Sequence, residues 1–172
     1  MSSTRIDVNV IGTSAVQKHR VAGSATRFYA GEPLDFTPTY TSGVSDVNTV
    51  TQAVDATPVI ATDVFVGIAA QDAPVGTDTT VDADWVDVIE VIPNFTRMRA
   101  KAQTAANVDT LSELIGLLYD YTLWDLTSGV FTIESASGSA ADTSGLIIMG
   151  GIWEQSMLDV IVDARAMRKQ VA

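Results

Sequence analysis

The stretch "DWVDVIEVIPNFTRMRAKA", residues 84–102, predicts two consecutive β-strands that meet at Pro93. Its first half is dominated by β-branched and aromatic residues, which favour strands. The proline ends that strand because it cannot donate to a ladder of backbone hydrogen bonds. In the second half, Arg97, Arg99 and Lys101 occupy every second position. Because side chains alternate along a strand, we expect all three cations on one face.

This basic stripe lies in an acidic chain of 172 residues with a formal net charge of -11. No Lys or Arg falls between Phe28 and Thr96, so the net charge comes from this middle segment. Nucleic-acid binding needs clustered Lys and Arg, and we therefore expect no nucleic-acid partner. Two interpretations of the stripe stay open. Its cations pair with acids on a neighbouring strand, such as Asp87 or Glu90, or they face another chain and set orientation at an interface.

The composition is apolar for so acidic a chain. Hydrophobic residues make up 47% of the sequence, and the mean hydropathy is +0.22 at a pI of about 4.2. This excess favours burial of surface against other chains; a β core rich in Val, Ile and Ala is the alternative. The absence of cysteine excludes disulfides, thiolate nucleophiles and cysteine metal sites. Because no apolar leader or membrane-length apolar run is present, we expect neither a signal peptide nor a membrane partner.

The remaining patterns predict a mainly β domain with one short helix. Thr110 and Glu113 have the spacing of a capping box. We expect the apolar stripe that follows them to face the core: Leu111, Leu114, Ile115 and Leu118. The apolar run at residues 64–70 predicts a strand buried on both faces. A hairpin around Ser128 and Gly129 and two late strands are also expected, at residues 121–134, 146–153 and 158–167. The sum indicates a small β-barrel or β-sandwich of one domain.

Residues 1–26 differ from the rest, since they show neither helical periodicity nor clean alternation. We interpret them as an extended N-terminal arm with one short strand, preceding a β-rich domain at residues 27–172. Such an arm can lie over a neighbouring subunit or remain disordered. Lys18, His19 and Arg20 form a second basic cluster within it.

The sequence offers few candidate catalytic residues. His19 is the only histidine, and its place between two bases is typical of a surface residue. The sequence has no nucleophile-elbow pattern, no phosphate-cradling glycine pattern and too few ligands for zinc. We therefore expect a protein that is not an enzyme and that holds no metal or cofactor.

Two weaker signals stay open. An acidic loop could hold calcium or simply be solvated; its carboxylates are Asp78, Asp82, Asp84 and Asp87. Three tryptophans could stack on sugar rings or pack in the core; they are Trp85, Trp124 and Trp153.

Four segments, taken in order, carry a resemblance to a known family. They are "RFYAGEPL", "TPVIATDVFVGIAAQDA", "VDVIEVIPNFTRMRAKAQTAANVDTLSELIGLLYD" and "YTLWDLTSGVFTIE". Their layout is a Gly-Ile-Ala strand, an acidic loop, a strand ending in proline, a basic strand, a short helix and a hairpin. In this order the chain resembles bacteriophage capsid decoration proteins, also called cement or head-stabilising proteins.

The resemblance implies a non-enzymatic virion protein on the capsid exterior. Such proteins are commonly trimers that bind the major capsid protein and bridge neighbouring coat subunits. The arm would then be a clasp, and the contact candidates are the two basic clusters: Lys18, His19, Arg20, Arg97, Arg99 and Lys101. The alternatives are a head-fibre or tail component of a phage, or a carbohydrate-binding β module.

Overall fold

The computed structural model describes residues 8–12, 14–21, 28–36, 39–41, 44–46, 49–60, 64–73, 85–135 and 143–167. For Arg20 and for the strands at 39–41 and 44–46 it describes the backbone only. Within these residues the chain is mainly β with one α-helix, as the sequence predicts. None of the helices in these ranges is long and apolar enough to cross a membrane.

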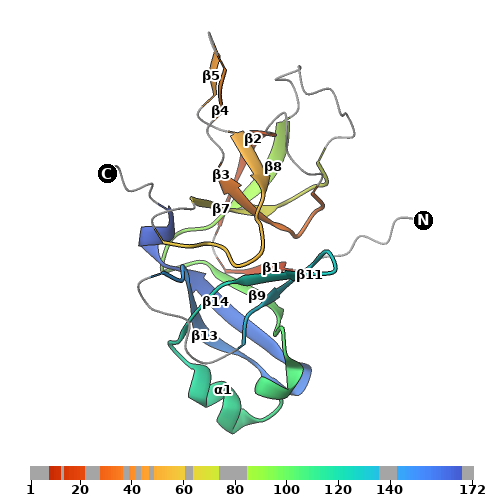
Figure 1. The fold of residues 1–172 in the computed structure, drawn as a ribbon, viewed down its shortest axis with the longest axis vertical. Coiled ribbons are helices and arrows are strands. Elements are labelled where there is room, and N and C mark those ends of the chain that lie inside the picture. Colours follow the sequence, from red (N-terminus) through yellow and green to blue (C-terminus); the bar gives the residue numbers. More distant parts are fainter. Residues whose placement is uncertain are drawn as a thin grey trace, which may run out of the picture.

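A closed five-stranded barrel forms the upper half of the molecule (Figure 1). Its strands pair in the order β2 (Ala15–Val21), β6 (Thr49–Gln52), β3 (Pro33–Phe36), β7 (Phe65–Ala69) and β8 (Trp85–Glu90). Only the β2–β6 pair within it is parallel. A two-stranded hairpin of β4 (Thr39–Thr41) and β5 (Val44–Asp46) projects above the barrel.

A five-stranded antiparallel sheet forms the lower half. Its order is β1 (Val8–Ile11), β9 (Arg97–Lys101), β14 (Met157–Val162), β13 (Leu146–Ile152) and β10 (Tyr121–Thr122). The predicted hairpin is confirmed as β11 (Trp124–Thr127) and β12 (Val130–Ile133), with Ser128 and Gly129 both at positive φ in the turn. Three short 3₁₀ helices complete the fold, η1 (Ala105–Asn107), η2 (Trp153–Gln155) and η3 (Ala164–Met167).

Two apolar cores result, and β7 contributes to both. Phe65 and Ile68 belong to the larger core beneath the barrel, whereas Val66 and Ala69 belong to the barrel interior. A register shift between β3 and β7 permits this sharing. Every residue of β7 is buried, so the predicted burial on both faces is confirmed.

The N-terminal segment corrects one interpretation made from the sequence. β1 pairs along the edge of β9, and β2 closes the barrel between β6 and β8. β1 is therefore a strand of the lower sheet and β2 a strand of the barrel, and a boundary at residue 26 does not separate an arm from a domain. Residues 1–7 and 22–27 lie outside the described part of the chain.

The helix α1 (Leu111–Leu117) begins with the predicted capping box. The Thr110 side chain accepts a hydrogen bond from the Glu113 N–H, and the Glu113 carboxylate accepts one from the Thr110 N–H. The predicted core stripe is only partly right, because Leu114 is buried while Leu111 and Ile115 are exposed. The physical reason is that the helix lies at the lower end of the molecule, where one side of it packs against β13 (Figure 1).

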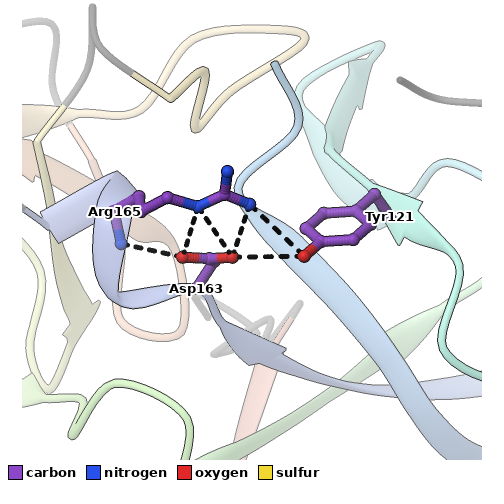
Figure 2. A network of polar contacts seen from close by, with 3 residues as sticks. All are labelled: Tyr121, Asp163 and Arg165. Carbon is purple, nitrogen blue, oxygen red and sulfur yellow. Dashed lines mark hydrogen bonds and ion pairs between the residues drawn. The ribbon is translucent and has the colours of Figure 1, made fainter. Parts of the chain in front are cut away.

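A polar network fixes the end of β14 (Figure 2). Asp163 accepts hydrogen bonds from the backbone N–H of Arg165 at 2.8 Å and from its Nη2 at 2.9 Å. The Tyr121 hydroxyl donates to the same carboxylate at 3.4 Å. This network joins β10 to η3, and η3 in turn packs against β7.

Candidate contact surface

The basic strand β9 presents its three cations on one face, as predicted. Met98 and Ala100 point into the larger core, while Arg97, Arg99 and Lys101 lie on the opposite side of the sheet. Because Pro93 redirects the chain, β8 belongs to the barrel and β9 to the lower sheet. The acids that immediately precede the stripe in sequence are therefore not its neighbours across the sheet.

Arg99 forms a bidentate ion pair with Asp159 of β14, directly across the strand register. Its Nε lies 2.6 Å from one carboxylate oxygen and its Nη2 lies 2.8 Å from the other. The hydrogen bond to the Asp159 side chain raises the pKa of Arg99 above its ordinary value. Pairing with an acid on a neighbouring strand is thus correct for Arg99, but the expected partners Asp87 and Glu90 are wrong.

Arg97 and Lys101 remain exposed at the two ends of the stripe. Lys101 donates from Nζ to the backbone oxygen of Gln155 at 3.1 Å. Across the described ranges, neither cation forms an ion pair. Both charges therefore remain candidates for a contact with another chain.

The cluster Lys18, His19 and Arg20 is divided by the alternation of β2. Lys18 points outward and pairs with Asp87 across the strands at 3.3 Å. His19 points inward, is only 6% exposed and contacts Glu90 at 2.7 Å. Its burial removes the His19 side chain from the contact candidates. The backbone of Arg20 pairs with Trp85 and Thr49, and its side chain lies outside the described structure.

The turn between β8 and β9 was missed as a surface feature by the sequence analysis. Ile92 is 43% exposed and Phe95 is 62% exposed. The N–H groups of Phe95 and Thr96 both donate to the Ile92 oxygen, at 3.0 and 2.9 Å. The Asn94 N–H donates to Val162 at 2.8 Å, which ties the turn to β14. The available signal was an aromatic residue directly after a Pro-Asn turn.

We call Ile92, Phe95 and Arg97 the turn surface. Its two apolar side chains stand on a hydrogen-bonded turn, and the cation follows at the start of β9. Aromatic and Arg side chains are the types that carry most binding energy in protein interfaces. Because the turn backbone is already held in place, little conformational entropy would be lost when a partner binds.

A cavity of about 320 Å³ lies beside the barrel, near η3. His19 and Glu90 are its polar lining, and the remaining lining is apolar: Phe36, Val64, Phe65, Val66, Val91 and Met167. The His19 Nδ1 is buried without a hydrogen bond. None of the described lining residues is a serine, threonine or cysteine that this His–Glu pair could activate.

The structure describes only some of the residues behind the two weaker sequence signals. These residues contain no group of three or more His, Asp or Glu side chains that could hold a metal ion. Asp87 is in β8, while Asp78, Asp82 and Asp84 lie outside the described ranges. Trp124 is fully buried and Trp153 packs against the larger core, which leaves Trp85 as the more exposed ring.

No protein-family model matches the chain, and no curated protein matches it. The function must therefore be argued from the surface itself and from the order of the elements.

Proposed function

We propose that this chain is a non-enzymatic structural protein of a phage virion. It binds the exterior of the assembled capsid and stabilises it by bridging subunits of the major capsid protein. The observation that carries the proposal is the turn surface, an exposed pair of apolar side chains on a hydrogen-bonded turn, beside a cation that forms no ion pair within the described part of the chain. The resemblance of the element order to decoration proteins suggests that the partner is the major capsid protein.

The turn surface suits binding to a large preformed partner. Burying a Phe side chain that is now 62% exposed would contribute on the order of 1–2 kcal/mol. Arg97 would add specificity and a faster association rate through complementary charge. One such contact is weak, but a trimer would engage three at once and gain from effective concentration. A head under internal pressure is stabilised by mass action when a ligand binds only its assembled state.

The first experiment measures binding of the purified chain to coat-only particles by co-sedimentation. We expect Phe95→Ser and Arg97→Glu each to weaken binding at least about tenfold, as truncation of interface hot spots does. The matched control is Val54→Ser, because Val54 is also 62% exposed but follows β6 away from the turn. Equal binding by all variants, with unchanged melting curves, would remove the turn surface from the proposal.

Copy number separates decoration from the other phage roles. The chain is quantified against the major capsid protein in gradient-purified particles of its source. A copy number comparable to that of the coat is expected. A few copies per particle would favour a head-fibre or tail component instead, and complete absence would contradict a virion role.

A further inference from the structure

The helix α1 has a second apolar side that nothing in the described structure covers. Leu111 and Ile115 lie four residues apart on α1 and are 54% and 57% exposed, and Tyr119, two residues past the end of the helix, is 70% exposed. Side chains four residues apart within a helix lie on one face, so Leu111 and Ile115 share a face of α1. The other side of the helix packs inward through Leu114 and Leu117, so the exposed side chains are not needed for the core. We call Leu111, Ile115 and Tyr119 the helix ridge.

The last residue of the ridge is held in a strained backbone conformation. Tyr119 has a φ of 70°, a left-handed conformation that bulky residues rarely adopt. Its N–H donates to the Ile148 oxygen at 2.8 Å, so the backbone is fixed by β13. Glycine would fit this position without strain. A large, exposed aromatic side chain at such a strained position points to use of that side chain by another molecule.

Charge restricts what can cover the ridge. Asp109 and Glu113 flank its first turn, and both are exposed or half-buried. The sequence has no Lys or Arg between Ala102 and Ala164. A favourable partner surface is therefore apolar with at least one unpaired cation. An acidic or purely apolar surface would leave these carboxylates without compensation.

The chain itself carries such a surface at the lower end of the five-stranded sheet. Lys101 lies opposite Met157 in the register, and Met157 lies opposite Ile152. Both apolar side chains are half-buried on the side of the sheet that Lys101 occupies, and Lys101 is exposed without an ion pair among the described residues. We call Lys101, Met157 and Ile152 the receiving face.

We infer that the helix ridge of one copy packs on the receiving face of a second copy of this chain. The contact is heterologous, because it joins two different surfaces. It forms a closed ring when the rotation that relates neighbouring copies adds up to a full turn. The contact buries the exposed apolar side chains of Leu111, Ile115 and Tyr119, in agreement with the high apolar content of this acidic chain. It also pairs Lys101 with Asp109. The inference rests on the proposed function only for its expectation of an oligomer, and it is tested without capsids.

The experiment is sedimentation equilibrium of the full chain over a range of concentrations. The wild type is expected to be an oligomer of the 18.2 kDa chain. Leu111→Ser/Ile115→Ser and Tyr119→Gly should each raise the dissociation constant at least about tenfold. Tyr119→Gly should also keep or raise the melting temperature at concentrations where both proteins are monomeric, because it relieves the left-handed tyrosine. If Tyr119 had only a structural role, its replacement would lower the melting temperature together with the association, and the two measurements would not diverge.

A charge exchange tests which surface receives the ridge. Asp109→Lys and Lys101→Glu should each weaken association, and the double variant should restore it. Val16→Ser is the matched control, because Val16 is 63% exposed on β2.

A monomeric wild type, or failure of the double variant to recover, overturns the inference. So does a ridge variant that stays oligomeric but loses particle binding, since the ridge would then contact the coat protein. An oligomer that forms through the ridge yet ignores capsids refutes the proposed function and leaves this inference standing.

Discussion

At the scale of single residues, the Arg99–Asp159 pair shows what strand alternation predicts and what it does not. The position of Arg99 on the outer side of β9 follows from the two-residue period of a strand. Its partner does not follow, because Asp159 is 60 residues away and reaches it only through the pairing of β14 with β9. Cross-strand partners depend on topology, and the local pattern contains no information on that topology.

Removal of Arg99 should be strongly destabilising. Asp159 is 5% exposed, so Arg99→Met leaves a buried carboxylate without its partner, and we expect a loss of about 3 kcal/mol in the free energy of unfolding. The double variant Arg99→Met/Asp159→Leu should recover most of that loss, because the buried charge is gone as well. Urea unfolding of the four proteins in the cycle measures the coupling. Additive losses from the two substitutions would show that the pair is not coupled.

The Asp163 network gives the chain a definite response to acid. Hydrogen bonds from the Arg165 side chain are the largest cause that lowers the pKa of Asp163 below its ordinary value (Figure 2). A lowered folded-state pKa stabilises the protein above the unfolded pKa of about 3.9, and the contribution is lost as pH falls through the folded value. Asp163→Asn should therefore be less stable than wild type at pH 7, and the difference should shrink below about pH 4. Urea midpoints at both pH values measure this, with the exposed Glu154→Gln as control.

At the scale of elements, the sequence predicts the strands with clear apolar patterns and fails for β2. β7, β8, β9 and β13 lie within the predicted ranges, whereas β14 begins one residue before its range of 158–167, and the last four residues of that range form η3 instead. In β2 the most deeply buried side chain is His19, so a polar residue stands where the pattern would need an apolar one. The alternation is hidden for that reason, and β1 with only four residues adds too little signal.

The place of β1 in the sheet can be tested with one acid at two neighbouring positions. Val8 is buried in the larger core, while Asn9 is exposed on the other side of the strand opposite Arg99. Val8→Asp should cost more than about 3 kcal/mol because it buries an unpaired charge, and Asn9→Asp should change stability by no more than about 0.5 kcal/mol. Chemical denaturation compares the two. Similar small effects at both positions would restore the interpretation of this segment as a separate arm.

At the scale of the whole molecule, the sequence predicts a mainly β fold of the barrel or sandwich kind, but not its division into a barrel and a sheet. The division depends on long-range pairing, such as the parallel β2–β6 contact and the register shift at β7. Gly67 marks the closest approach in this region, since a Cβ there would overlap the carbonyl oxygen of Ile89. This approach packs β7 against β8 inside the barrel, while Phe65 and Ile68 of the same strand belong to the larger core, so β7 itself links the two parts.

This sharing of β7 predicts that the two cores unfold together. Leu34 is fully buried in the barrel core, and Leu158 is fully buried in the larger core. Each Leu→Ala substitution should cost about 2–5 kcal/mol. In a Trp85→Phe background, which removes the tryptophan of the barrel strand β8, fluorescence reports on the larger core through Trp124 and Trp153. In a cooperative molecule Leu34→Ala therefore shifts the urea midpoint of this fluorescence even though the cavity lies in the barrel. Far-UV circular dichroism should follow the same curve for both variants. A fluorescence midpoint that Leu34→Ala leaves in place, with a second transition in the dichroism, would mean that the barrel unfolds on its own and that β7 does not couple the two cores.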